Sequence, residues 1–279
     1  MAMVARNTFP AGSPFLKWVG GKAGLLEQIV PLLPRFSGSY HEPFLGGGAV
    51  FFRVGHARRA FLSDCNSELI DCYRAVQADV EAVIAALSSS RFVYGETPYY
   101  AVRALTPESL PPAERAARFI YLNKCGFNGL YRVNSKGKFN VPIGRFTGSP
   151  NFCDADGLRS AATTLGDATI SCEPFEAMRR AKKGDLVYCD PPYDPLTATA
   201  NFTSYTKNGF TRDDQRQLCD LCTDLKRRGV HVAVSNSSTP FINALYREAG
   251  FTLHPIWARR NINANPDRRG AVEEILAVS

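Results

Sequence analysis

The sequence predicts an α/β protein with a mainly parallel sheet. Short apolar segments typical of buried strands alternate with helical patterns along most of the 279 residues, and this alternation favours strands that are covered by helices. Two apolar segments, residues 40–45 and 186–189, run directly into a run of glycines and into a polar tetrapeptide. Because ligands of parallel sheets bind beyond the carboxyl ends of the strands, both turns are expected to line a ligand site.

The N-terminal third supplies the first elements of this fold. A short helix is expected over residues 22–33, where Pro34 ends it. Residues 40–45 are extended, and the apolar run AFLSD at 60–64 predicts a strand closed by an acidic residue. A helical pattern follows over residues 67–87.

The middle of the chain has a different pattern. Residues 97–122 are predicted to be mainly helical, with an interruption near Pro111 and Pro112. The segment YRVNSKGKFNVP that follows predicts a β-hairpin whose turn is Ser135-Lys136-Gly137. This basic helical segment therefore separates the two α/β halves of the chain as an insertion.

Beyond residue 155 the strand–helix alternation resumes. Thr211 is placed to cap one helix, and Gly229 and Gly250 lie just past the ends of two helices. The expected strands are 169–172, 186–189, 230–234, 251–257 and 272–278, and the expected helices are 213–227 and 240–248.

The glycine run in HEPFLGGGAV, residues 41–50, follows a strand pattern and opens a helix. Glycine lets the backbone approach a ligand closely, although a tight structural turn is the alternative. No Gly-Lys-Ser/Thr follows, so the turn is not a phosphate-binding P-loop. Asp64 ends the next strand about 20 residues later, where an acidic side chain reaches the ribose of a nucleoside cofactor; capping of the following helix is the alternative. Without an arrangement for pyrophosphate, these features favour a cofactor such as S-adenosylmethionine.

The tetrapeptide Asp190-Pro191-Pro192-Tyr193 directly follows the apolar strand at 186–189. An exocyclic amine of a nucleobase is a poor nucleophile because its lone pair is delocalised into the ring. A carboxylate from Asp190 and the carbonyl of Pro191 would accept its two hydrogens and expose the lone pair. Proline fixes φ and stiffens this turn, and Tyr193 offers a ring on which an extruded base can stack. A plain strand-ending turn is the alternative.

Composition narrows the class of protein. No apolar run approaches the ~20 residues that a membrane helix needs, and the first ten residues lack the apolar stretch of a secretory signal. The eight cysteines are scattered, which favours reduced thiols in a cytoplasmic protein. Cys219 and Cys222 have the spacing of half a metal site, but no second pair matches them, so we expect both in the core and predict no metal.

The charge is concentrated in the middle of the chain. The net charge is +7, and residues 101–150 contain eight basic residues against two acidic ones. Such an excess favours a polyanionic partner, with a solvated basic face as the alternative. The basic residues are Arg103, Arg115, Arg118, Lys124, Arg132, Lys136, Lys138 and Arg145.

Seven sequence blocks resemble a known family in one consistent order. They are FLKWVGGK at 15–22, EPFLGGG at 42–48, LSDCN at 62–66, NKCGFNGLYR at 123–132, FNVP at 139–142, DPPY at 190–193 and ANF at 200–202. Across essentially the whole chain, the sequence resembles the Dam-type (alpha-class, D12) adenine-N6 DNA methyltransferases. The resemblance implies a Rossmann-like, S-adenosylmethionine-dependent methyltransferase fold. It further implies a catalytic domain of residues 1–66 and 153–279 and an inserted, mainly helical DNA target-recognition domain of residues 67–152, which carries the hairpin.

The resemblance also assigns residues to the cofactor and to catalysis. Asp190 and Pro191 would bind the target amine, Pro192 would complete the turn, and Tyr193 would stack on the flipped base. The residues implied for S-adenosylmethionine are Trp18, Lys22, Phe44, Gly46, Gly48, Asp64 and Asp190. From the sequence alone, Trp18 is equally well a core residue and Lys22 a solvated charge.

For DNA, the resemblance implies a GATC site read by the basic insertion. Arg132 would read a guanine, Leu130 and Pro142 would contact a thymine methyl, and Phe127 with Asn128 would enter the base stack. The full set implied for DNA is Lys17, Lys124, Phe127, Asn128, Leu130, Arg132, Lys138, Asn140 and Pro142. Alternatives are that Phe127 and Leu130 belong to the core and that Arg132, like Lys124 and Lys138, only contacts phosphate.

The sequence thus predicts a monomeric enzyme of the cytoplasm, in a bacterial nucleoid or a phage-infected cell, that methylates adenine N6 in double-stranded DNA. One alternative is a cytosine-N4 methyltransferase, in which serine more often replaces Asp190. Another is a glutamine methyltransferase, which usually has asparagine before Pro-Pro-Tyr. A third is a DNA-binding regulator that has lost catalysis, against which the intact Asp190 and Tyr193 argue.

Overall fold

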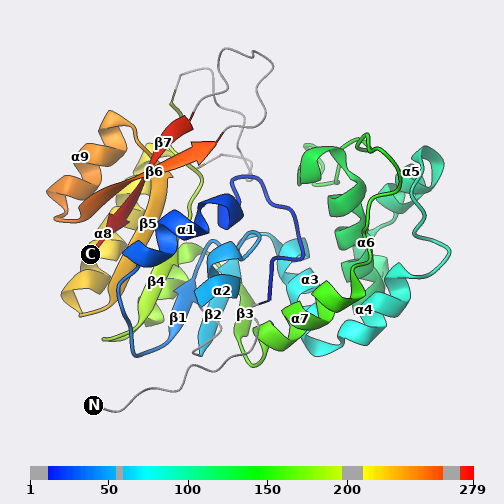
Figure 1. Cartoon of the computed structure of the whole chain (residues 1–279), viewed down its shortest axis with the longest axis horizontal. Helices are drawn as coiled ribbons and strands as arrows, with labels where there is room; N and C mark the ends of the chain where they lie inside the picture. Colours follow the sequence, from blue (N-terminus) through cyan, green and yellow to red (C-terminus); the bar gives the residue numbers. More distant parts are fainter. Residues whose placement is uncertain (1–11, 55–58, 197–209, 260–270) are drawn as a thin grey trace.

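The computed structural model describes residues 12–54, 59–196, 210–259 and 271–279. The block Ala200-Asn201-Phe202 lies outside these residues. Within them, seven strands form one sheet in the order β3-β2-β1-β4-β5-β7-β6 (Figure 1). The strands are β1 Tyr40–Glu42, β2 Ala60–Asp64, β3 Thr169–Cys172, β4 Leu186–Cys189, β5 His231–Ser237, β6 Thr252–Arg259 and β7 Ala271–Val278.

The direction of the strands places the ligand site. Strands β1 to β5 run parallel to one another, whereas β7 runs antiparallel between β5 and β6. The chain order reverses between the central strands β1 and β4, since β1 leads outward to β2 and β4 leads outward to β5. Such a switch point opens a crevice beyond the carboxyl ends of the two strands, which confirms the predicted α/β class.

Two hydrophobic cores cover the two faces of the sheet. Along β4, Leu186 and Tyr188 belong to one core, and Val187 and Cys189 belong to the other, as the two-residue period of a strand requires. The helices of the second core are α8 Arg212–Arg227 and α9 Pro240–Glu248. Cys219 and Cys222 are buried there, as predicted.

The first core continues from the sheet into a group of helices beside β3 (Figure 1). Helix α3 packs against both β3 and α6, and so joins the sheet to this group. The elements of this group are α3 Ser67–Ala78, α4 Val80–Leu87, α5 Glu96–Ala104, η4 Pro107–Ser109, α6 Pro112–Cys125, η5 Phe127–Gly129 and α7 Ala155–Leu165. Helix α2 Ala49–Val54 instead lies in front of the sheet (Figure 1).

Several elements differ from the sequence expectation. Residues 22–33 are not one helix but η1 Lys22–Leu25, α1 Leu26–Ile29 and η2 Val30–Leu32. The predicted helix at 67–87 breaks at Asp79, whose side chain accepts from Ala82 N and starts α4. Helix α7 was not predicted; Asp154 caps it by accepting from Gly157 N.

The predicted hairpin forms its turn but no regular strands. A single antiparallel bridge joins Val133 and Phe139. Backbone bonds from Asn134 N to Lys138 O and from Asn140 N to Arg132 O flank this bridge. The Asn134 side chain also accepts from Lys136 N and Lys138 N (2.9 and 3.1 Å), so side-chain bonds take up backbone donors at the turn and the ladder stays short.

Candidate active site

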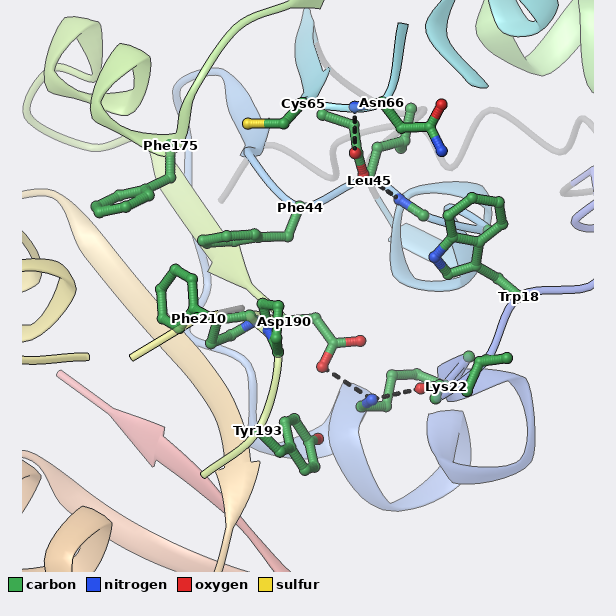
Figure 2. A pocket seen from close by; sticks show the side chains of 18 of the residues that line it. Trp18, Lys22, Phe44, Leu45, Cys65, Asn66, Phe175, Asp190, Tyr193 and Phe210 are labelled. Carbon is green, nitrogen blue, oxygen red and sulfur yellow. Dashed lines mark hydrogen bonds and ion pairs between the residues drawn. The ribbon is translucent and has the colours of Figure 1, made fainter. Parts of the chain in front are cut away.

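A cavity of about 1020 Å³ lies at the carboxyl ends of β1, β2 and β4. All of the predicted catalytic and cofactor residues line it (Figure 2). They come from four separate parts of the chain and are Trp18, Lys22, Phe44, Gly46, Gly48, Asp64, Asp190, Pro191, Pro192 and Tyr193.

The glycine turn after β1 is required by its surroundings. Gly46 and Gly48 have φ of +47° and +67°, a region that favours glycine. A Cβ on Gly46 would lie 2.6 Å from Cδ1 of Trp18, so any side chain there would displace the indole. The turn and Trp18 therefore form a close-fitting wall, and Trp18 both lines the cavity and packs against the first core.

Asp64 fixes the glycine turn from the end of β2. Its Oδ2 accepts from Gly46 N at 3.0 Å, and its Oδ1 accepts from Asn66 N at 2.9 Å. The cap of α3 is instead Asn66, which accepts from Leu69 N, so the capping alternative for Asp64 is wrong. Burial raises the pKa of Asp64, and hydrogen bonds from backbone N–H groups oppose the rise. Each carboxylate oxygen still has a lone pair for a ligand hydroxyl.

Three phenylalanines form an aromatic wall that the sequence analysis identified only in part. Phe44 lies nearly parallel to Phe175, with centroids 5.6 Å apart, and Phe210 stands edge-on to Phe44 at 5.9 Å (Figure 2). Phe175 follows the end of β3 and Phe210 precedes α8. Phe175 could have been identified from its position shortly after the end of a strand, the same signal that identified Asp64 and Asp190. The wall suits the flat ring of a nucleoside.

Glu42, at the end of β1, is a further carboxyl of the cavity that was not predicted as a site residue. It is buried and accepts from the Tyr40 hydroxyl at 2.7 Å. Burial raises the pKa of Glu42 to about 8, and the charge of Asp190 contributes to the rise. The bond from Tyr40 and the charge of Lys22 oppose this rise.

Lys22 and Asp190 form a buried ion pair. Lys22 Nζ lies 2.8 Å from Asp190 Oδ1 (Figure 2), and it also donates to Gly20 O at 2.5 Å. Since Lys22 is only 4% exposed, the solvated-charge alternative is wrong. Burial raises the pKa of Asp190, whereas the ammonium of Lys22 and the nearby Tyr193 hydroxyl lower it. The ammonium thus favours the carboxylate form in a site that would otherwise favour the acid.

This pairing predicts a pH effect for Lys22→Met. Loss of the ammonium should raise the pKa of Asp190, and a reaction that needs the carboxylate is lost as pH falls through that pKa. The acid limb of kcat against pH should therefore move to higher pH, and each unit of movement lowers the ionised fraction about tenfold on that limb. The profile is measured at saturating methyl donor. In Lys22→Arg, which keeps the positive charge, the acid limb should move less. Equal pH profiles for Lys22→Met and the wild type would contradict the pairing.

The residues implied for DNA lie outside the cavity, near a turn at the end of α6. In η5, Asn128 has φ of +53°, and Phe127 is 48% exposed, so the core alternative for Phe127 is wrong. Leu130 is half-buried against the first core. The buried Asn123 side chain bonds both the N and the O of Lys17 and also Gly129 O, which holds Lys17 beside this turn.

The rest of these residues surround the incomplete hairpin. Arg132 is exposed, and its Nε donates to Asn140 Oδ1 at 2.7 Å. Pro142 is exposed while its carbonyl accepts from Phe127 N. Lys138 is exposed in the turn, and burial lowers the pKa of the half-buried Lys124.

Three of the eight basic residues serve the protein's own structure. Arg118 is buried and pairs with Glu68 at 3.0 Å, and Arg115 pairs with Asp71 at 2.8 Å; both carboxylates lie on α3. Arg103 donates to Val141 O at 3.1 Å. The basic excess available to a polyanion is thus smaller than the sequence suggested.

The fold and the cavity define a class of enzyme: an α/β protein with a nucleoside-type crevice and an Asp-Pro-Pro-Tyr turn inside it. The family model for the D12 class N6 adenine-specific DNA methyltransferases matches residues 18–262, and the chain belongs to this family. The family implies an enzyme that depends on S-adenosylmethionine and acts on DNA.

Several relatives align with nearly the whole chain. It is 40% identical over 273 residues to the Type II methyltransferase M1.LlaDCHI of Lactococcus lactis subsp. cremoris, covering 95% of each chain. It is 40% identical to the Type II methyltransferase M.MjaIII of Methanocaldococcus jannaschii, covering 95% of this chain and 98% of the relative. It is 39% identical to the DNA adenine methylase of Escherichia coli, and the alignment covers 95% of this chain and 94% of the relative. In the part of the chain that is described, no helix is long and apolar enough to cross a membrane.

Proposed function

We propose that this protein transfers a methyl group from S-adenosylmethionine to N6 of an adenine turned out of double-stranded DNA, at GATC. The observation that carries the proposal is the shared cavity: the carboxylate of Asp190 lies in the same space as the glycine turn and Asp64. A nucleoside cofactor and a target base held in this space would lie next to each other. Such proximity is itself a large catalytic contribution.

The residues present fit a nucleoside methyl donor. We assign the ribose to Asp64, the nucleobase to the wall of Phe44 and Phe175, and the close backbone approach to Gly46 and Gly48. Trp18 and Lys22 close the side toward the target. When bound, S-adenosylmethionine supplies a methyl group on a positively charged sulfur.

The protein's part in the reaction is to hold the amine. We assign one N–H of the adenine amine to Asp190 and the other to the carbonyl of Pro191. The Pro192 carbonyl already accepts from Gln215 at 2.8 Å. This bond stiffens the turn that presents the Pro191 carbonyl. Two acceptors aimed at the amine hydrogens favour a pyramidal nitrogen with its lone pair exposed. Asp190 is then placed to take the proton that the amine releases, and Tyr193 stacks on the base.

We assign DNA recognition to residues 67–152 as a target-recognition domain, together with Lys17. The exposed turn of Phe127 and Asn128 fits entry into the base stack, because the Phe127 ring is 48% exposed and Asn128 has a positive φ. Arg132, fixed by Asn140, would read a guanine. Leu130 and Pro142 would contact a thymine methyl. Lys124 and Lys138 would contact phosphate, which positions the protein without reading sequence.

Two duplexes of identical composition test this function. One duplex contains a single GATC site, and the other contains GTAC in its place within the same flanks. No further GATC occurs in either duplex. After incubation with S-adenosylmethionine, nucleoside analysis should find N6-methyladenine in the GATC duplex alone. N4-methylcytosine would support the cytosine alternative, and no modified base would support a regulator. Equal methylation of both duplexes would remove GATC from the proposal while keeping the chemistry.

A further inference from the structure

The aromatic ring of Tyr193 is held by a residue far from it in sequence. Its hydroxyl donates to Glu274 Oε2 at 3.0 Å, across 81 positions of sequence. Glu274 lies on β7, the antiparallel strand between β5 and β6. Both side chains line the cavity. Lys22 lies over the face of the Tyr193 ring, with its Nζ 4.8 Å from the ring centroid.

The backbone on both sides of Tyr193 is held separately, by a pair of buried amides. Gln215 Nε2 donates to Pro192 O at 2.8 Å, and Asn236 Nδ2 donates to Gln215 Oε1 at 3.0 Å. The Asp194 N–H in turn donates to Asn236 Oδ1 at 3.2 Å. Gln215 is 1% exposed and Asn236 0%. The peptide groups before and after Tyr193 are therefore both fixed, and the remaining freedom of this residue is rotation of its side chain.

The charge of Glu274 needs an explanation in a cavity that receives DNA. A carboxylate beside a polyanion disfavours binding, and Asp190 already supplies one negative charge there. One task of this carboxylate is to accept the hydrogen bond from the Tyr193 hydroxyl. Burial and the neighbouring carboxylates of Asp190 and Glu274 raise the pKa of Tyr193, so the phenol keeps the proton that this bond uses.

We propose that Glu274 is a positioning residue that sets the rotation of the Tyr193 ring for stacking on the target adenine. The proposal rests on the function assigned to Tyr193 above. With the backbone clamped, a ring held at its hydroxyl presents one face to the cavity before DNA arrives. The side-chain entropy of the ring is then lost on folding rather than on base capture. Glu274 itself touches neither the reacting amine nor the methyl donor in this scheme.

A double-mutant cycle of Tyr193→Phe and Glu274→Ala tests the proposal, because Phe keeps the ring and removes only the hydroxyl. Each single variant should lower kcat on the GATC duplex by about two- to tenfold, the range that one hydrogen bond supports. The double variant should be no worse than the poorer single one, since both changes remove the same bond. Multiplying effects would show that Glu274 acts without Tyr193 and would overturn the proposal.

A second readout separates positioning from mere stability. With 2-aminopurine in place of the target adenine, fluorescence rises when the base leaves the stack. Both single variants should reduce this fluorescence rise, and the double variant should reduce it no further than the more affected single variant. Thermal unfolding of each variant identifies any that has not folded. A fluorescence rise equal to wild type in folded Glu274→Ala would also overturn the proposal.

The neighbouring glutamate provides a matched control for charge. Glu273 accepts from Ser238 at 2.9 Å and lies next to Glu274 on β7. If only the negative charge near the cavity matters, Glu273→Ala should behave as Glu274→Ala does. We expect instead that its effect multiplies with that of Tyr193→Phe. Failure of the wild-type protein to methylate adenine at all would count against the proposed function, whereas additive effects in an active enzyme count only against Glu274.

Discussion

Asp190→Ala should reduce methyl transfer by on the order of 10²–10⁴-fold, the usual contribution of a positioned proton-accepting group. The amine of adenine would lose the acceptor that exposes its lone pair, while the cofactor wall and the DNA contacts remain. Rates are measured under single-turnover conditions, and DNA affinity is measured separately by titration. Affinity for the GATC duplex should change little by comparison.

The buried ion pair complicates this variant and dictates its control. Alanine leaves the Lys22 ammonium buried without its carboxylate, and breaking a buried pair costs about 3–5 kcal/mol of folding stability. Asp190→Asn keeps the shape and one oxygen acceptor, and the double variant Lys22→Met with Asp190→Ala removes both charges. All three should be inactive or nearly so while the double variant recovers stability. Near-normal turnover in any folded variant would refute the role of Asp190.

Arg132→Ala should relax discrimination at one guanine of the target by about 1–3 kcal/mol, or roughly 5- to 150-fold. In the free protein Asn140 already holds the guanidinium at 2.7 Å, so little side-chain entropy is lost on reading the base. The measurement is kcat/KM on GATC against duplexes that differ only at the guanine. The wild type should separate these duplexes and the variant should not.

Arg132→Lys distinguishes base reading from phosphate binding. Lysine keeps the charge but lacks the planar fork that pairs with O6 and N7 of guanine. If Arg132 reads the base, lysine should restore overall DNA affinity without restoring discrimination. If Arg132 only contacts phosphate, alanine should weaken binding equally on every sequence, and lysine should repair it.

Much of the site could be predicted because its residues stand at the ends of strands. The glycine turn, Asp64 and Asp190 each follow an apolar run, and the geometry of a parallel sheet brings such ends together. The pattern that identifies these positions is local in sequence. The structure confirms the strands that carry them and places the three groups in one cavity.

Residues whose roles depend on distant partners could not be predicted in this way. The pairing of Lys22 with Asp190 joins positions far apart in the chain, and nothing local to either residue indicates it. The same holds for Arg118, which counts as a surface charge in the sequence but is buried against Glu68. Charge concentration in a segment therefore overestimates the surface offered to DNA.

The incomplete hairpin and the broken first helix are elements whose local structure the sequence pattern did not predict. Asn134 offers its side chain to the backbone of the turn, and this local competition is invisible to a pattern based on alternation. Residues 22–32 fold into three short pieces, which place Lys22 in the cavity. In both places the departure from regular structure coincides with a proposed contact to cofactor or DNA.

The place of β7 bears on how the protein matures in the cell. Translation delivers this strand after its two neighbours, yet it sits between them in the finished sheet. Until then, one side of β5 is unpaired and β6 has no partner strand in the described sheet, a state that invites misassociation with other chains. An intermediate that lacks β7 would hence be inactive and prone to aggregation, and its demand for chaperones should fall once β7 pairs with both neighbours.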